Sequence, residues 1–223
     1  MSGRLRWWML AGPTWLWLTL AIAMDSELES RVLAYAVKRF GQPADARLKP
    51  WFSMLHGAAA LNETEKLQLV NTFFNRIPND SDVSHWGAED YWSTPVELLA
   101  SNGGDCEDFA LAKYFTLREL GVPDARLRMT YAKAYLRQTG KIESHMVLTY
   151  STAPGSEPLI LDNLIDAIQP ASRRTDLTPT YSFNVATLWV AHERQNGRNT
   201  ADVDVLSAWR ELRSRMLRME DMK

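Results

Sequence analysis

The sequence predicts an α+β fold in which a group of helices precedes an antiparallel sheet. Apolar residues recur at helical spacing between Asp25 and Gly121, whereas apolar and polar residues alternate from Arg126 onward. Turn-forming residues separate the alternating runs. Helices followed by consecutive strands are typical of α+β domains. The 223 residues, 46% of them hydrophobic, are sufficient for one domain with its own core.

The N-terminal segment has the features of a secretory signal peptide. Arg4 and Arg6 precede an uncharged stretch from Trp7 to Met24, and Ala21-Ile22-Ala23 fits a cleavage site. We therefore expect a signal peptide at residues 1–23 and a mature domain at residues 24–223. Cleavage removes two of the 25 basic residues and leaves 23 against 27 acidic ones, a net charge of −4. An uncleaved membrane anchor is the alternative.

Cap and stop signals divide the first half of the chain into five predicted helices. Each begins after a polar N-cap or at a first-turn proline, and each ends at a glycine, a proline or a polar turn. In order, these helices are Glu27–Phe40, Pro43–Ala59, Asn62–Ile77, Thr94–Ser101 and Cys106–Gly121, the last with Asp105 as its expected cap. The polar segment from Asn79 to Trp92 is expected to be a loop.

The second half of the chain predicts a meander of strands and a final helix. The main strands are expected at Arg126–Leu136, Glu143–Tyr150 and Glu157–Leu164, with edge strands at Ile165–Ile168 and Tyr181–Asn184. An amphipathic pattern predicts a helix over Val203–Met219. The net charge of −2, without any basic run, gives no reason to expect nucleic-acid binding.

The single cysteine is the first candidate functional residue. Cys106 follows Gly103-Gly104 at a predicted helix start, and an exported protein with one cysteine forms no internal disulfide. The positive end of the helix favours a thiolate, and its free N–H groups can stabilise an oxyanion. Cys106 is therefore a candidate nucleophile.

A nucleophilic cysteine needs a base and a group that orients the base. His145 lies in the middle of a predicted strand, and Asp162 ends the apolar run of the next strand. A hairpin would bring the two side by side, although Asp162 also fits a simple turn residue. His85 is retained as a rival base. Its aromatic neighbours, such as Trp86 and Trp92, are expected to pack the floor of a cleft.

The motifs GDCEDFA, HMVL and LDNL together resemble those of bacterial transglutaminase-like cysteine peptidases of the LapG type, which are periplasmic, adhesin-cleaving proteases. The resemblance implies a papain/transglutaminase-like fold, with Cys106 as the nucleophile, His145 as general base and then acid, and Asp162 as the orienting acid. It further implies a large surface adhesin as substrate, whose release disperses a biofilm. An inner-membrane receptor for cyclic-di-GMP is implied as the inhibitor.

Three acids crowd the cysteine: Asp105, Glu107 and Asp108. One or two acids at a helix start are ordinary caps, but like charges raise the pKa of a thiol. A bound hard dication reverses this effect, and calcium prefers such oxygen ligands. The resemblance also implies calcium dependence with these acids as ligands. We therefore expect Asp105, Glu107 and Asp108 to bind a calcium ion, with carbonyls or water completing the ligand set.

Three other functions remain open on the sequence. The same three residues could transfer an acyl group from glutamine to an amine, as in a transglutaminase. A calcium-responsive binding module without catalysis is the second alternative, although the complete set Cys106, His145 and Asp162 argues against it. A membrane-tethered structural protein is the third, if the leader is not cleaved.

Overall fold

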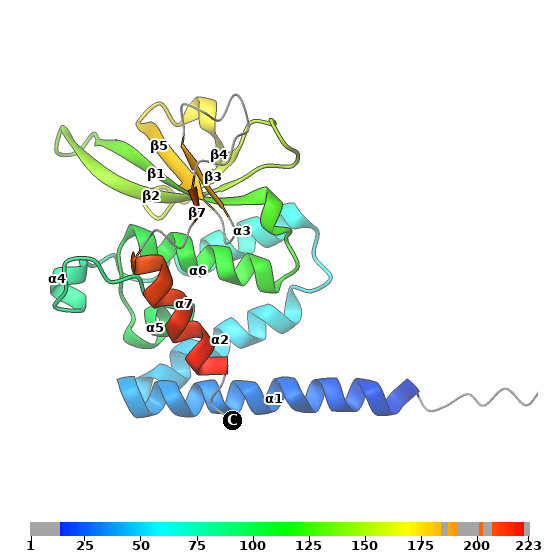
Figure 1. Ribbon diagram of the computed structural model, residues 1–223. Coiled ribbons are helices and arrows are strands. Elements are labelled where there is room, and N and C mark those ends of the chain that lie inside the picture. The colour runs from blue at the N-terminus through cyan, green and yellow to red at the C-terminus, as the bar shows by residue number, and fades with distance from the viewer. Residues whose placement is uncertain (1–13, 184–186, 191–200, 203–206, 221–223) are drawn as a thin grey trace, which may run out of the picture.

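The chain folds into a group of helices that lies against one face of a seven-stranded antiparallel sheet (Figure 1). The structure is a computed structural model that describes residues 14–183, 187–190, 201–202 and 207–220. Its α-helices are α1 Thr14–Phe40, α2 Pro43–Gly57, α3 Glu63–Phe74, α4 Asp82–His85, α5 Pro95–Ser101, α6 Cys106–Glu119 and α7 Ser207–Glu220. This confirms the predicted α+β class. None of the described helices has the length and apolarity needed to cross a membrane.

The sheet is built on a long central hairpin. Its strands are β1 Leu127–Leu136, β2 Lys141–Tyr150, β3 Leu159–Leu161, β4 Gln169–Pro170, β5 Leu177–Phe183, β6 Thr187–Val190 and β7 Ala201–Asp202, and two 3-10 turns lie at Asp124–Arg126 and Ala171–Arg173. The strand order is β4-β3-β2-β1-β5-β6-β7. Leu148 pairs with Leu161, so β3 lies beside the C-terminal end of β2.

Helix α6 lies under the sheet and forms the centre of the core (Figure 1). Alternate residues of β2, such as Met146 and Leu148, face the helices and are fully buried. Trp209 of α7 fills the other end of this core, 5.7 Å from the ring of Phe183 and 6.4 Å from that of Trp92. The C-terminal helix α7 is therefore joined to the sheet through one aromatic cluster.

The helix signals of the first half are largely confirmed. Asn62 and Thr94 each form a capping box with the glutamate three residues later. The first helix differs, because α1 begins at Thr14 and continues through Asp25-Ser26. A polar pair inside an otherwise helical run is an insufficient stop when the residues on both sides favour helix. The proposed cleavage site after Ala23 lies within α1, and signal-peptide removal stays a prediction.

Several predicted boundaries were wrong. The expected loop before Trp92 contains the short helix α4, whose N-cap Ser81 accepts a hydrogen bond from the Ser84 N–H. The edge strand expected at Ile165–Ile168 instead begins at Gln169. Strand β5 begins at Leu177 and includes Pro179 at an irregularity in its pairing with β1, a position at which proline is tolerated in a strand. Residues Asn184 and 203–206 of the predicted elements lie outside the described residues.

Candidate active site

The three predicted catalytic residues come together at one end of the sheet. Cys106 is the first residue of α6, His145 lies in β2, and Asp162 directly follows β3. Cys106 and His145 line the same cleft of about 200 Å³, together with Asn79, Asp105, Glu143 and Leu164. The cleft lies between the hairpin of β1 and β2 on one side and the loops at Asn79 and Asn163 on the other.

The Gly103-Gly104 pair allows the chain to pass close to its neighbours before the cysteine. A Cβ on Gly103 would lie 2.7 Å from the His85 ring, and one on Gly104 would lie 2.4 Å from Asp108 Oδ2. Neither glycine has a positive φ. The glycines are therefore required by packing rather than by a turn, and Gly104 in particular leaves room for the Asp108 carboxylate.

The Cys106 thiol is held in its neutral form by its surroundings. Its Sγ donates a hydrogen bond to Glu107 Oε2 at 2.8 Å. Burial raises the pKa of Cys106 well above its usual range, and the charges of Glu107 and Asp105 raise it further. Within the described part of the chain, no hydrogen bond joins Sγ to His145. The sequence-based expectation that flanking acids oppose thiolate formation is borne out by these contacts.

His145 and Asp162 form a buried, hydrogen-bonded pair. His145 Nε2 donates to Asp162 Oδ1 at 2.8 Å, and both side chains are almost completely buried. The same Oδ1 accepts the Leu164 N–H at 3.0 Å, and Oδ2 accepts Arg174 Nη2 at 2.6 Å. Burial alone would raise the pKa of Asp162, but the hydrogen bond and charge of His145, the Leu164 N–H and Arg174 lower it to about 2. Asp162 is therefore ionised throughout the neutral pH range.

A second group of acids lies behind the cysteine. Asp82, Asp105 and Asp108 each place a carboxylate oxygen within 4.8 Å of the others. Asp82 Oδ2 accepts the Tyr91 N–H, and Asp108 Oδ1 accepts the Ser93 N–H, each at 2.6 Å. One further oxygen of each carboxylate is buried and has no hydrogen-bond partner in the described structure: Asp82 Oδ1, Asp105 Oδ1 and Asp108 Oδ2.

The acidic cluster (Asp82, Asp105 and Asp108) has the properties of a cation site. Burial and the neighbouring negative charges raise the pKa of Asp105 to about 9. Burial also raises the pKa of Asp82, and that of Asp108 to about 7. Three partly desolvated carboxylates with unpaired oxygens are costly unless a proton or a cation compensates them. An all-oxygen donor set of this kind fits calcium.

The structure places one further acid, Asp82, beside two of the three predicted metal ligands. Asp105 and Asp108 meet Asp82, whereas the Glu107 carboxylate groups with Asp105 and the Cys106 thiol. Asp105 occupies the N-cap position of α6, but its side chain makes no capping hydrogen bond. Sequence reasoning missed Asp82, because a polar loop residue 23 positions before Asp105 carries no local signal of this contact. The only local feature of Asp82 is its position as the first residue of α4, directly after the N-cap Ser81.

His85 and its aromatic neighbours have a packing role. His85 Nε2 lies 2.8 Å from Ser101 Oγ, and His85 Nδ1 lies 3.4 Å from Asp80. The Trp86 ring packs on His85 and on Tyr91, with centroids at 4.8 Å and 4.5 Å. His85 is not among the residues that line the cleft with Cys106. The geometry therefore favours His145 over His85 as the base.

Lys113 is a buried cation that the sequence did not single out. It follows Cys106 by seven residues on α6, on the same face of the helix, and it is completely buried. Its Nζ lacks a hydrogen-bond partner in the described structure. Burial lowers the pKa of Lys113 to about 7, although the charges of Asp162 and Asp166 oppose this shift.

Comparison with known proteins identifies the class to which this fold and site belong. Residues 53–194 match the family described as bacterial transglutaminase-like cysteine proteinases. The chain belongs to this family, and it is a cysteine peptidase of transglutaminase-like fold. The sequence-based expectation of a papain/transglutaminase-like fold is thereby confirmed.

Solved structures of Legionella pneumophila LapG are similar to this chain at 37% sequence identity. The EGTA-treated structure matches with a TM-score of 0.73 and covers 84% of this chain and 97% of that one. The calcium-bound structure matches with a TM-score of 0.70 over 84% and 98% of the two chains. A comparison with curated proteins returns no match.

Proposed function

We propose that this peptidase is a calcium-dependent endopeptidase of the periplasm that uses Cys106, His145 and Asp162 as its catalytic triad. The observation that carries the proposal is the 2.8 Å bond between His145 Nε2 and buried Asp162, on the wall of the cleft that Cys106 lines. A histidine fixed in this way by an ionised acid is the arrangement that a cysteine nucleophile needs.

The residues divide the reaction between them as follows. Because Nε2 of His145 is bonded to Asp162, Nδ1 is the ring nitrogen that accepts the thiol proton. The thiolate attacks the peptide carbonyl, and N–H groups of the first turn of α6 stabilise the oxyanion. The protonated imidazole then donates its proton to the leaving amine, and water releases the acyl group from Sγ. Asp162 stays ionised throughout and supports the imidazolium.

The acidic cluster supports calcium dependence. Asp82, Asp105 and Asp108 would hold the ion through their unpartnered oxygens, with Glu107 available next to Asp105. Bound calcium supplies positive charge that offsets the carboxylates beside the thiol. With the ion bound, Glu107 would no longer need the Cys106 proton as its partner, and the thiol pKa would fall. The calcium-bound and EGTA-treated forms of the similar Legionella protein support calcium dependence.

We further propose that the substrate is the N-terminal region of a large surface adhesin, whose cleavage releases the adhesin and disperses a biofilm. The proposed regulator is the periplasmic domain of an inner-membrane receptor for cyclic-di-GMP, which sequesters the peptidase. Similarity to LapG over most of the chain supports this proposal, as does the signal-peptide pattern at residues 1–23.

The test is cleavage of an adhesin N-terminal fragment by purified residues 24–223. We expect discrete products, identified by mass spectrometry, in calcium but not in EGTA. Cys106→Ser is expected to abolish cleavage, and Glu119→Gln on the exposed side of α6 serves as the matched control. Incorporation of a primary amine into a glutamine peptide, without hydrolysis, would instead identify an acyltransferase. Absence of both reactions from a folded, calcium-binding protein would favour the binding module.

A further inference from the structure

Arg174 is a buried arginine behind the His145–Asp162 pair. Its Nη2 donates to Asp162 Oδ2 at 2.6 Å and to Asp176 Oδ2 at 2.8 Å, and its side chain is 2% exposed. Its Nε donates to Asp176 Oδ1 at 3.0 Å. The four side chains His145, Asp162, Arg174 and Asp176 therefore form a continuous hydrogen-bonded line from the cleft to the start of β5.

The backbone holds Arg174 in this place from both sides. The Leu177 N–H donates to the Arg174 carbonyl at 3.0 Å, and the Tyr135 N–H donates to the Asp176 carbonyl at 2.8 Å. The turn that carries the arginine is thus attached to β5 and to β1. Because Asp176 takes up one side of the guanidinium, the Nη2 that faces Asp162 has little freedom to turn away.

We propose that Arg174 is a positioning residue for the peptidase reaction, which fixes the Asp162 carboxylate in its ionised form and in the orientation that His145 requires. The proposal rests on the proposed function of the triad. Asp162 has one oxygen committed to His145 and Leu164, and Arg174 holds the other. Without the arginine, the Asp162 carboxylate is free to rotate about its side-chain bond. The His145 imidazole, which is bonded to this carboxylate, would move with it and lose its alignment with Cys106 Sγ.

The charges around Asp162 determine how the arginine acts. Asp162 is faced by His145 from β2, by Arg174 from the turn before β5 and by Lys113 from α6. Asp166 lies near Lys113. Arg174 is the one cation among these that bonds directly to Asp162 and is charged at every relevant pH. Its removal leaves a buried carboxylate with less compensation, so the pKa of Asp162 rises.

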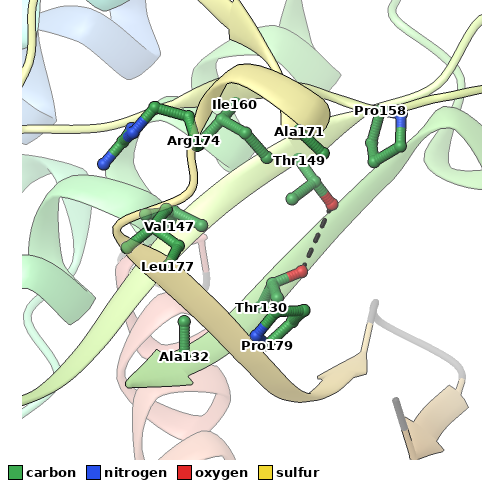
Figure 2. A pocket seen from close by; sticks show the side chains of 10 residues that line it. All are labelled: Thr130, Ala132, Val147, Thr149, Pro158, Ile160, Ala171, Arg174, Leu177 and Pro179. Carbon is green, nitrogen blue, oxygen red and sulfur yellow. Dashed lines mark hydrogen bonds between the residues drawn. The ribbon is translucent and has the colours of Figure 1, made fainter. Parts of the chain in front are cut away.

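A small pocket of about 60 Å³ adjoins the arginine on the sheet face away from the helices. Figure 2 shows that the stem of Arg174 lies at its border, while the guanidinium points away from Thr149 and Thr130 at its centre. Truncation of Arg174 would join this pocket to the space beside Asp162. Free guanidinium ion could then enter and occupy the place of the missing group.

The experiment compares Arg174→Ala and Arg174→Lys with wild type, using Arg173→Ala as the control because Arg173 is the exposed neighbour. We expect Arg174→Ala to lower kcat about 10- to 100-fold with little change in KM. Because the pKa of Asp162 is higher in the variant, the acidic limb of the kcat/KM profile should move to higher pH. Millimolar guanidinium chloride should restore activity, whereas sodium chloride of equal ionic strength should not.

A second readout requires no substrate. The downfield proton resonance of the His145–Asp162 hydrogen bond should weaken or shift in Arg174→Ala and return with guanidinium. A folded Arg174→Ala protein with an unshifted acidic limb, an unaltered resonance and no rescue would overturn the proposal and leave Arg174 a structural residue only. If Arg174→Ala does not fold, the same criteria apply to Arg174→Gln, which also lacks the positive charge. Wild-type protein that shows the resonance but cleaves nothing would contradict the proposed function instead.

Discussion

Asp108→Asn is expected to stabilise the calcium-free protein while removing its response to calcium. Asp108 is completely buried, with Oδ1 bonded to the Ser93 N–H and Oδ2 unpartnered beside the other acids of the cluster. The amide of the variant keeps an acceptor for Ser93. It also presents a donor to Asp82 and Asp105, so the substitution removes a buried negative charge and leaves the local contact intact.

The magnitude follows from the pKa of Asp108, which burial raises from 3.8 to about 7. The folded state binds the Asp108 proton more tightly than the unfolded state does. The stabilising contribution of this proton is therefore fully present below pH 3.8 and is lost as the pH rises through 7. The raised pKa costs about 4 kcal/mol of stability at pH 8, where folded Asp108 is ionised, and about 2 kcal/mol at pH 5, where folding requires uptake of a proton. The variant avoids this cost and should exceed wild type in EGTA by up to these amounts.

The assay is urea unfolding at pH 5 and pH 8, followed by tryptophan fluorescence, in EGTA and in calcium. Wild type should gain about 3 kcal/mol at a calcium concentration 100 times its Kd, and the variant should gain little. Glu119→Gln on the same helix should stay within about 0.5 kcal/mol of wild type in all conditions. A variant that is less stable than wild type in EGTA at pH 8 would refute the reasoning and make Asp108 a structural capping acid.

Three further predictions concern other buried groups. The free energy of unfolding of Lys113→Met should rise by about 3 kcal/mol relative to wild type when the pH is lowered from 9.5 to 7. The reason is that the pKa of Lys113 is about 7 in the folded state and 10.5 in the unfolded state. A difference between variant and wild type that does not change with pH in urea unfolding would contradict this. Gly104→Ala should displace Asp108 and weaken calcium binding measured by calorimetry, whereas Gly57→Ala, with open space around its Cβ, should not. Asn62→Ala should lower the free energy of unfolding by about 1 kcal/mol through loss of its capping box.

The part of the site that could be predicted from the sequence depends on local relations. Cys106 is marked by its place at a helix start, and the register of adjacent strands brings Asp162 to His145. Such pairings follow from strand period and hairpin connection. The capping boxes are equally local, because each joins residues three positions apart.

The remaining site residues depend on contacts between elements that are distant in the sequence. Asp82 reaches Asp105 because the chain near Asp80 pairs with Gly104, where the Asp80 N–H donates to the Gly104 carbonyl at 2.8 Å. Arg174 reaches Asp162 through a turn that only the order of β3, β4 and β5 defines. No periodicity or cap signal encodes either contact, because both arise from tertiary packing.

Thiol reactivity tests the central claim, that the acids around Cys106 are a calcium site that controls a catalytic thiol. The measurement is the rate of alkylation of Cys106 by iodoacetamide in purified residues 24–223 from pH 5 to pH 9, with calcium and with EGTA. We expect fast alkylation near neutral pH in calcium and slow alkylation in EGTA, where Glu107 and Asp105 hold the thiol pKa high. Equal rates in the two conditions would contradict the account.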